Sequence, residues 1–177
     1  LTGLLRGRRG TERHMGSHVP GERFVLLATA PFVARGAADI GRELVYRVTP
    51  SGGGTATTAY ITFAGESARL FSPVWARASR SGPGDVTVTW LRRSKIGTEL
   101  PNAGDIPLDE PTEQYMIEVL NGANVVRTAS TTTSAYVYSA ADQVADFGAL
   151  PSSLSVRIAQ VGRLVASSPT LEATFQF

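Results

Sequence analysis

Apolar and polar residues alternate along residues 85–92, which read Asp85-Val86-Thr87-Val88-Thr89-Trp90-Leu91-Arg92. Val86, Val88 and Trp90 fall on one side, and the threonines between them fall on the other. This period of two predicts a strand with one buried face and one face in solvent. The sequence Ser81-Gly82-Pro83-Gly84 breaks the chain before the strand, and Trp90 supplies a large apolar anchor. We expect the core of a β-sandwich to form around this strand.

Further strand patterns fill the second half of the chain. Pro73 restricts the first of them to a sheet edge or a strand start, because proline cannot donate to the ladder. Asn121-Gly122 predicts a tight hairpin turn. In the segment from Leu154 to Val161 we expect Leu154, Val156 and Ile158 to point inward and Ser155, Arg157 and Ala159 outward. The predicted strands are residues 71–78, 85–92, 115–120, 125–128, 135–138, 154–161 and 171–177.

The connections between these strands complete the prediction. Residues 93–111 are polar and rich in turn formers, which indicates a long loop that crosses between sheets. Residues 140–148 are the one plausible helical turn, with Gly148 as its stop. About seven strands are expected of an immunoglobulin-like or fibronectin type III sandwich. The absence of cysteine rules out the Cys…Trp…Cys spacing and favours the fibronectin-like variant.

The first half of the chain predicts a smaller β-rich subdomain. Its expected strands are residues 22–27, 44–49 and 57–63, and Gly52-Gly53-Gly54 would form a hairpin tip. Three short strands joined by long connections make a subdomain that we expect to be too thin to be stable alone. We therefore expect an all-β chain in which residues 1–70 form an arginine-rich arm and a small β subdomain that docks on the following domain or on a neighbouring chain. Residues 71–177 would form the fibronectin type III-like β-sandwich.

Composition and charge limit the classes of partner that the chain can bind. The chain has 177 residues, 18% of them charged, with a net charge of only +2. We therefore expect no nucleic-acid partner, and no apolar run is long enough to span a membrane. The basic excess is local, and the arm is either a partly ordered leader or pairs its guanidinium groups with acids on a partner. The arginines concerned are Arg6, Arg8, Arg9 and Arg13.

The beginning of the chain indicates a fragment. Arginines follow Leu4-Leu5, so the apolar stretch of a signal peptide is not found there. The first residue is Leu instead of Met. We expect the chain to be a piece of a longer polypeptide.

Catalytic and metal-binding patterns are weak. His14 and His18 are four residues apart, but no Glu lies between them and Gly16 argues against a helix, so we predict no metal site. No nucleophile elbow occurs, and the triple glycine lacks the Lys and Ser/Thr of a phosphate-binding loop. We predict no enzyme, no catalytic residue and no cofactor. The carboxylates weighed as an acid and base pair are Asp105, Asp109, Glu110 and Glu113, which we interpret as a solvated face.

Aromatic residues offer one alternative. Sugar-binding β-sandwiches stack sugar rings on exposed aromatic side chains, and Trp75, Tyr136 and Tyr138 are candidates. The competing interpretation is that Tyr136 and Tyr138, on one strand face, pack in the core or against the neighbouring sheet.

Several short segments resemble one family. They are residues 4–12, 16–18, 21–27, 72–74, 88–93, 115–119, 138–143 and 154–160, including Leu4-Leu5-Arg6-Gly7-Arg8-Arg9-Gly10, Gly21-Glu22-Arg23-Phe24-Val25-Leu26-Leu27 and Tyr138-Ser139-Ala140-Ala141-Asp142-Gln143. Together they resemble the C-terminal region of tail-tip hub, or host-specificity, proteins of long-tailed phages and gene transfer agents. The resemblance is a string of short matches spanning nearly the whole chain, and it contains no catalytic signature.

The resemblance implies a structural virion protein at the distal end of the tail, acting in tail assembly and host attachment. It implies three copies around the tail axis, contacts with other baseplate proteins, and a host receptor or glycan. Some members carry a glycoside-hydrolase-like barrel upstream, which nothing here matches. The alternative, from another class, is a carbohydrate-binding module accessory to a polysaccharide-active enzyme.

Overall fold

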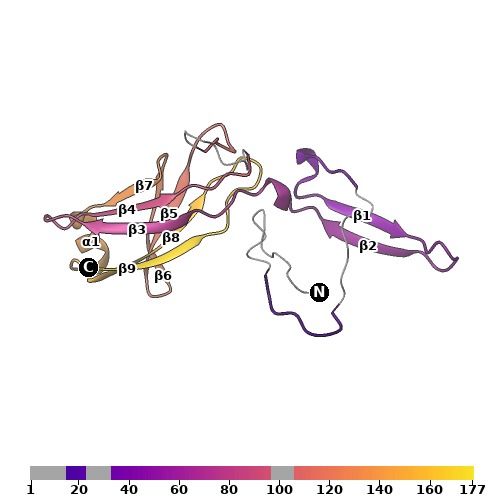
Figure 1. The fold of residues 1–177 in the computed structure, drawn as a ribbon, viewed down its shortest axis with the longest axis horizontal. Coiled ribbons are helices and arrows are strands. Elements are labelled where there is room, and N and C mark those ends of the chain that lie inside the picture. The colour runs from indigo at the N-terminus through magenta and orange to yellow at the C-terminus, as the bar shows by residue number, and fades with distance from the viewer. Residues whose placement is uncertain (1–14, 23–32, 97–105) are drawn as a thin grey trace. The chain divides into compact units, whose positions relative to one another are not determined.

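The computed structural model describes residues 15–22, 33–96 and 106–177 (Figure 1). Contacts divide the chain into two compact units, which meet in sequence between Ala68 and Arg69. The first unit spans Gly16–Ala68 and the second contains Arg69–Phe177. Four predictions lie outside the described residues: most of the strand at 22–27, the four arginines of the arm, His14 and Asp105.

The first unit is built on one antiparallel hairpin. Strands β1 (Glu43–Val48) and β2 (Thr57–Thr62) pair from Glu43 opposite Thr62 to Val48 opposite Thr57. The triple glycine, which was predicted to form the hairpin tip, lies in the connection between the two strands. There Gly53 N donates to Pro50 O at 3.2 Å. Short 3₁₀ turns, η3 (Ala37–Asp39) and η4 (Glu66–Ala68), precede and follow the hairpin. The strands predicted at 44–49 and 57–63 are therefore confirmed.

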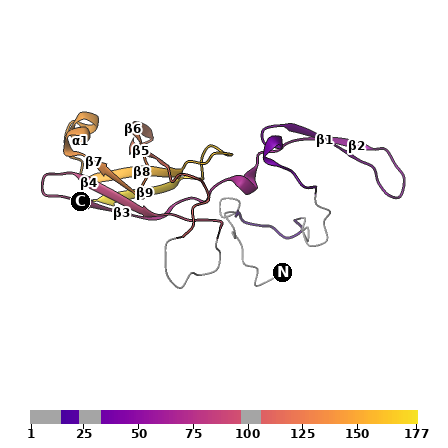
Figure 2. The ribbon, with the colours of Figure 1, turned by 90° about the horizontal axis from the view of Figure 1, so that it is seen from above.

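The second unit is a sandwich of two antiparallel sheets. One sheet has the order β3-β4-β7 and the other β6-β5-β8-β9 (Figures 1 and 2). The fourth strand of the sandwich, β6, therefore pairs with the third, β5. This division into three and four strands is the fibronectin type III-like sandwich, and the predicted fold class is confirmed. The strands are β3 (Val74–Arg80), β4 (Val86–Leu91), β5 (Tyr115–Asn121), β6 (Asn124–Thr131), β7 (Ala135–Tyr138), β8 (Ser153–Gln160) and β9 (Leu171–Gln176).

The alternation predicted for β4 builds the core. Trp90 is only 2% exposed and meets Tyr115 edge to face, with ring centroids 5.1 Å apart. Leu154, Val156 and Ile158 of β8 are buried, as expected from their spacing. Ala159 was expected to face outward but is buried. It lies in a central strand opposite Met116. Its small side chain is buried, whereas the longer side chain of Arg157 on the same face is partly exposed.

The β5–β6 hairpin turns one residue later than the sequence suggests. Asn121 pairs with Asn124, so the two-residue loop is Gly122-Ala123. Gly122 has φ 60°, and Ala123 is not among the residues with positive φ. Positive φ at the first loop position alone is the type II′ pattern, in which glycine is preferred there. The hairpin was predicted correctly and its central residues were not.

Helix α1 (Ala140–Phe147) closes one end of the sandwich. The Ser139 side chain accepts from Asp142 N, and Gly148 ends the helix with φ 79°. The C-terminus lies at the same end (Figures 1 and 2), where Phe177 N donates to Ser152 O at 2.9 Å. The helical turn predicted over residues 140–148 is confirmed.

One buried side chain fastens this helix to the sheets. Gln143 is fully buried, and its Nε2 donates to Gly84 O and Tyr138 O, both at 2.9 Å. Its Oε1 accepts from Arg80 Nη2 at 3.2 Å. Gly84 has φ 103°, and a Cβ there would lie 2.8 Å from the Leu150 side chain. The β3–β4 turn and the helix are thus packed closely against each other.

Candidate functional site

The described loop acids, expected to form a solvated face, are instead bonded within the fold. Asp109 accepts from Ser94 Oγ at 2.7 Å and from the backbone N–H groups of Lys95 and Ile96 at 2.9 Å and 3.2 Å. Burial lowers the pKa of Lys95, and the charges of Asp109 and Glu110 oppose that shift. Asp109 therefore holds the first part of the long connection by its backbone.

Glu113 is bonded in the same way. It accepts from Tyr115 Oη at 2.7 Å and from Ser134 Oγ at 3.2 Å, and Arg92 Nη1 lies 3.9 Å away. Burial raises the pKa of Tyr115, and the bond to Glu113 raises it further. Tyr115 thus stays protonated and donates a hydrogen bond to Glu113. These contacts tie the start of β5 to the segment before β7.

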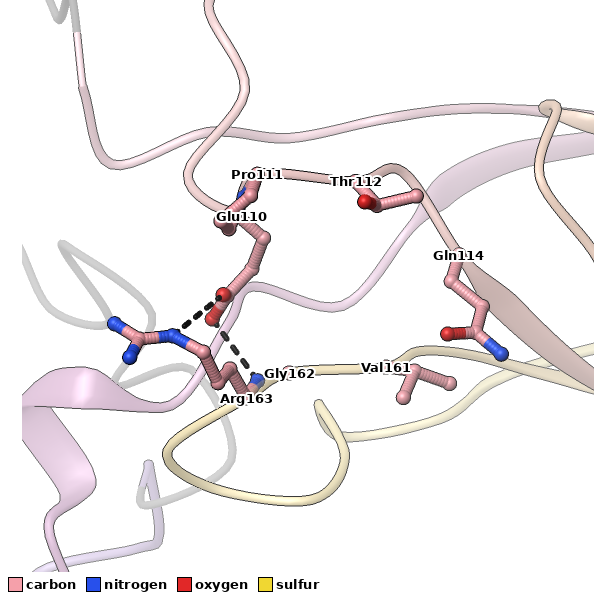
Figure 3. A pocket seen from close by; sticks show the side chains of 7 residues that line it. All are labelled: Glu110, Pro111, Thr112, Gln114, Val161, Gly162 and Arg163. Carbon is pink, nitrogen blue, oxygen red and sulfur yellow. Dashed lines mark hydrogen bonds and ion pairs between the residues drawn. The ribbon is translucent and has the colours of Figure 1, made fainter.

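Glu110 lines a pocket with Arg163, shown in Figure 3. Glu110 Oε1 accepts from Arg163 N at 3.1 Å, and its Oε2 lies 3.9 Å from Arg163 Nε. The pocket volume is about 280 Å³, and segments 110–114 and 161–163 form its walls. Val161 N also donates to Gln114 O at 2.8 Å. These contacts join the segment that leads into β5 to the segment that follows β8.

The acids do not form an acid and base pair among the described residues. Glu110 bonds to Arg163, Asp109 to backbone N–H groups, and Glu113 to hydroxyl groups. Hydrolysis by two carboxylates needs a pair facing one substrate position. Asp105 lies outside the described residues.

The remaining histidine has a simple partner. His18 Nδ1 bonds to Glu22 Oε2, and both side chains are exposed. In the described ranges, no group of three or more His, Cys, Asp or Glu side chains could hold a metal ion. No helix in those ranges is both long and apolar enough to cross a membrane.

A polar cluster joins α1 to β6 and β7. Arg127 Nε and Nη2 donate to the Asp146 carboxylate at 2.6 Å and 3.1 Å, and Tyr138 Oη donates to it at 2.6 Å. Arg127 Nη2 lies 2.9 Å from Asp142 Oδ1. The hydrogen bonds from Arg127 lower the pKa of Asp146, and Tyr138 adds to the effect. Every charged group in this cluster has a partner, so we assign it to stability.

The three aromatic candidates separate. Tyr138 is buried in the core, and Tyr136 packs against that core with its ring 6.3 Å from the Tyr138 ring. Their expected packing in the core is confirmed. Trp75 is 72% exposed, and Figure 1 shows its strand β3 at the edge of the three-stranded sheet, one of the two positions that Pro73 allows. Trp75 is thus the candidate that the structure leaves open to a ligand.

Trp75 lies in a β-bulge. Val74 pairs with Leu91 and Arg77 with Thr89, so Trp75 and Ala76 together stand opposite Trp90. Trp75 has φ 55°, the left-handed region that glycine occupies at the first position of a G1 bulge. It shares a depression of about 330 Å³ with Arg77, Thr89, Trp90 and Leu91. This surface, which we call the Trp75 face, is the best candidate site in the described residues.

The sequence indicates only part of the Trp75 face. The aromatic ring makes Trp75 a candidate, but the sequence does not single out Arg77, Thr89 or Leu91 as its neighbours. Thr89 was visible as an outward position of the alternating strand, and Arg77 lies two residues after Trp75. The bulge that sets the pairing between these strands has no marker such as glycine, so the grouping was not predictable.

Comparisons with known proteins yield similarities of fold. No protein-family model matches the chain, and the curated proteins likewise give no match. A crystal structure of the rat CD45 extracellular region, domains d3-d4, is similar with 14% identity and a TM-score of 0.46, covering 92% of this chain and 79% of that one. A crystal structure of chicken CNTN1 FN1-FN3 domains has 16% identity and a TM-score of 0.43, covering 77% and 44%.

Proposed function

We propose that this chain is a structural segment of the tail tip of a phage or phage-like particle, such as a gene transfer agent. It acts in tail assembly and host attachment and has no catalytic role. The single observation that carries the proposal is the exposed apolar surface of the β1–β2 hairpin. The resemblance of short segments along the chain to tail-tip hub proteins supports the tail tip as the assembly in which this surface is buried.

The hairpin has apolar side chains on both faces. Val45 and Tyr60 stand opposite each other and are 63% and 66% exposed. Ile61 and Val48 are also exposed. A two-stranded hairpin is at best marginally stable in water and needs a further layer over an apolar face. This surface therefore suits burial in an assembly.

The outer edge of β2 also supports burial of the hairpin in an assembly. Strand β2 reads Thr57-Thr58-Ala59-Tyr60-Ile61-Thr62, without a charge or a proline. Charges, prolines and bulges are the means by which proteins protect an edge strand from pairing with another chain. An edge without them suits pairing with copies of the chain or with another tail-tip protein, and we propose a homotrimer in the particle.

The rival function, a free-standing carbohydrate-binding module, predicts several coplanar exposed aromatic rings on the sandwich. Tyr138 is fully buried and Tyr136 is partly buried, so neither extends the exposed surface of Trp75. The tail-tip proposal therefore remains the better supported of the two.

Peptide mapping by mass spectrometry of purified particles from the source organism tests the proposal. We expect peptides of this chain in the particles. Recovery of the chain only as a secreted protein of this length would overturn it.

A pair of variants tests the role of the hairpin. Tyr60→Glu should reduce incorporation of the protein into particles, because it places a charge in the surface to be buried. Val137→Glu is the matched control, since Val137 is an exposed apolar strand residue of the sandwich, 58% accessible. Equal incorporation of the two variants would argue against docking through the hairpin.

A further inference from the structure

We propose that the Trp75 face is a glycan-binding site, in which a pyranose ring stacks on the Trp75 indole. The inference rests on the host-attachment part of the proposed function and adds the ligand class and the residues. Four observations support it: the exposure of the ring, its backbone conformation, the polar groups beside it and the size of the depression.

The exposure and backbone of Trp75 are the first argument. A side chain that could bury a large apolar area instead leaves 72% of its surface in solvent. Its residue also holds φ 55°, a backbone conformation that is strained for any residue other than glycine. Such outliers cluster at ligand clamps and other functional sites. The bulge thus keeps an aromatic plane available on the surface at a cost in stability.

The neighbours of the ring provide hydrogen bonds. Arg77 makes no hydrogen bond or ion pair with the described residues, unlike Arg80, Arg127 and Arg157. Its guanidinium offers up to five N–H donors, and the exposed Thr89 hydroxyl both donates and accepts. A sugar ring presents apolar C–H groups on its faces and hydroxyl groups around its rim, so it fits an aromatic plane flanked by such groups.

The size and charge of the depression argue against larger ligands. Its volume of about 330 Å³ lies at the low end of small-molecule sites. Arg77 is the one charged residue among those that line it, whereas polyanion binding relies on several cationic contacts. One or two sugar units suit this space and this charge.

The test uses the purified 177-residue chain on an array of bacterial surface polysaccharides and oligosaccharides. We expect at least one glycan to bind, and Trp75→Ala to weaken binding about tenfold or more. Arg77→Ala should also weaken it, and Val125→Ala, which removes an exposed apolar side chain from β6 of the other sheet, should leave it unchanged. Trp75→Gly, which suits the positive φ and should fold well, must lose binding like Trp75→Ala.

A second readout uses the natural fluorescence. The chain has two tryptophans, and Trp90 is buried. Iodide quenching therefore reports mainly on Trp75, and the glycan found on the array should protect it. Absence of binding to every glycan, binding unaffected by Trp75→Ala, or no protection from iodide would each overturn the proposal. So would dissociation of an oligomer by Trp75→Ala with no change in glycan binding, which would assign the face to a protein partner.

The failures of the two proposals are distinguishable. Particles containing peptides of this chain would support the tail-tip role even if no glycan bound. Glycan binding by a chain absent from particles would overturn the tail-tip role and leave the Trp75 face as a binding site.

Discussion

The hairpin of the first unit and the sandwich of the second are both made of strands with apolar residues, yet they bury very different amounts of them. Ile158 of β8 is fully buried, whereas Ile61 of β2 is 53% exposed. In the sandwich, two sheets cover each other's apolar faces, and in the hairpin no second layer is present among the described residues. Strand formation and burial are therefore separate consequences of sequence, and only burial stabilises the strand strongly.

The largest expected difference comes from trimming the two isoleucines. Ile158→Ala should destabilise the chain by about 2–5 kcal/mol, because it leaves a cavity in a packed core. Ile61→Ala, the matched change at an exposed position, should stay within about 0.5 kcal/mol. Urea unfolding followed by circular dichroism gives both values. A large loss for Ile61→Ala would mean that the isolated chain already buries the hairpin.

The helix end of the sandwich gives the next largest effect. Gln143→Ala should cost about 1–3 kcal/mol, because Gly84 O and Tyr138 O lose buried donors and Arg80 loses an acceptor. Val144→Ala, at a half-exposed position of the same helix, is the control and should have a small effect. Thermal unfolding of both variants decides this. Equal losses would show that the Gln143 bonds contribute little beyond helix packing.

The fold was predictable wherever local pattern determines the result. The alternation of Val86, Val88 and Trp90 sufficed to place β4, and Pro73 limited β3 to a sheet edge or placed the proline at the strand start. The burial of Gln143 was not predictable, because Gly84, one of its partners, lies 59 residues away in the chain. The same applies to Ala159, whose cover comes from its neighbours in the sheet.

The candidate site was less predictable than the fold for a related reason. The sequence offers Trp75 as a ring but does not show whether the ring is exposed. Exposure depends on the bulge opposite Trp90, and thus on the pairing of two strands. The buried Tyr138 illustrates the same limit, since its surroundings come from β4 and α1 as well as its own strand.

Unlike the buried core residues, Trp75 lowers the stability of the fold, because its backbone is strained. Trp75→Gly should be about 1 kcal/mol more stable than Trp75→Ala, since glycine accepts φ 55° without strain. The exposed ring contributes little packing that the comparison could confuse. Chemical unfolding of the two variants measures the difference. An Ala variant at least as stable as the Gly variant would contradict the left-handed conformation.

The smallest expected effect concerns pH and the pair of Arg127 with Asp146. Hydrogen bonds from Arg127 and Tyr138 lower the Asp146 pKa in the folded chain, whereas an unfolded aspartate has a pKa of about 3.9. The carboxylate thus stabilises the fold above about pH 4, and this contribution is lost as pH falls through the lower folded pKa. Asp146→Asn should cost about 0.5–1 kcal/mol at pH 7, since the pair is only partly buried, and progressively less under acid conditions.

Urea unfolding of the wild-type chain and Asp146→Asn from pH 7 to about pH 2.5 measures how the difference depends on pH. Glu172→Gln is the control, because Glu172 bonds to Arg157 on an exposed surface and should contribute a few tenths of a kcal/mol at most. A difference for Asp146→Asn that stays constant or grows as pH falls would mean that the carboxylate is not held by its charge. The cluster would then stabilise the helix end through packing, as apolar residues do in the core.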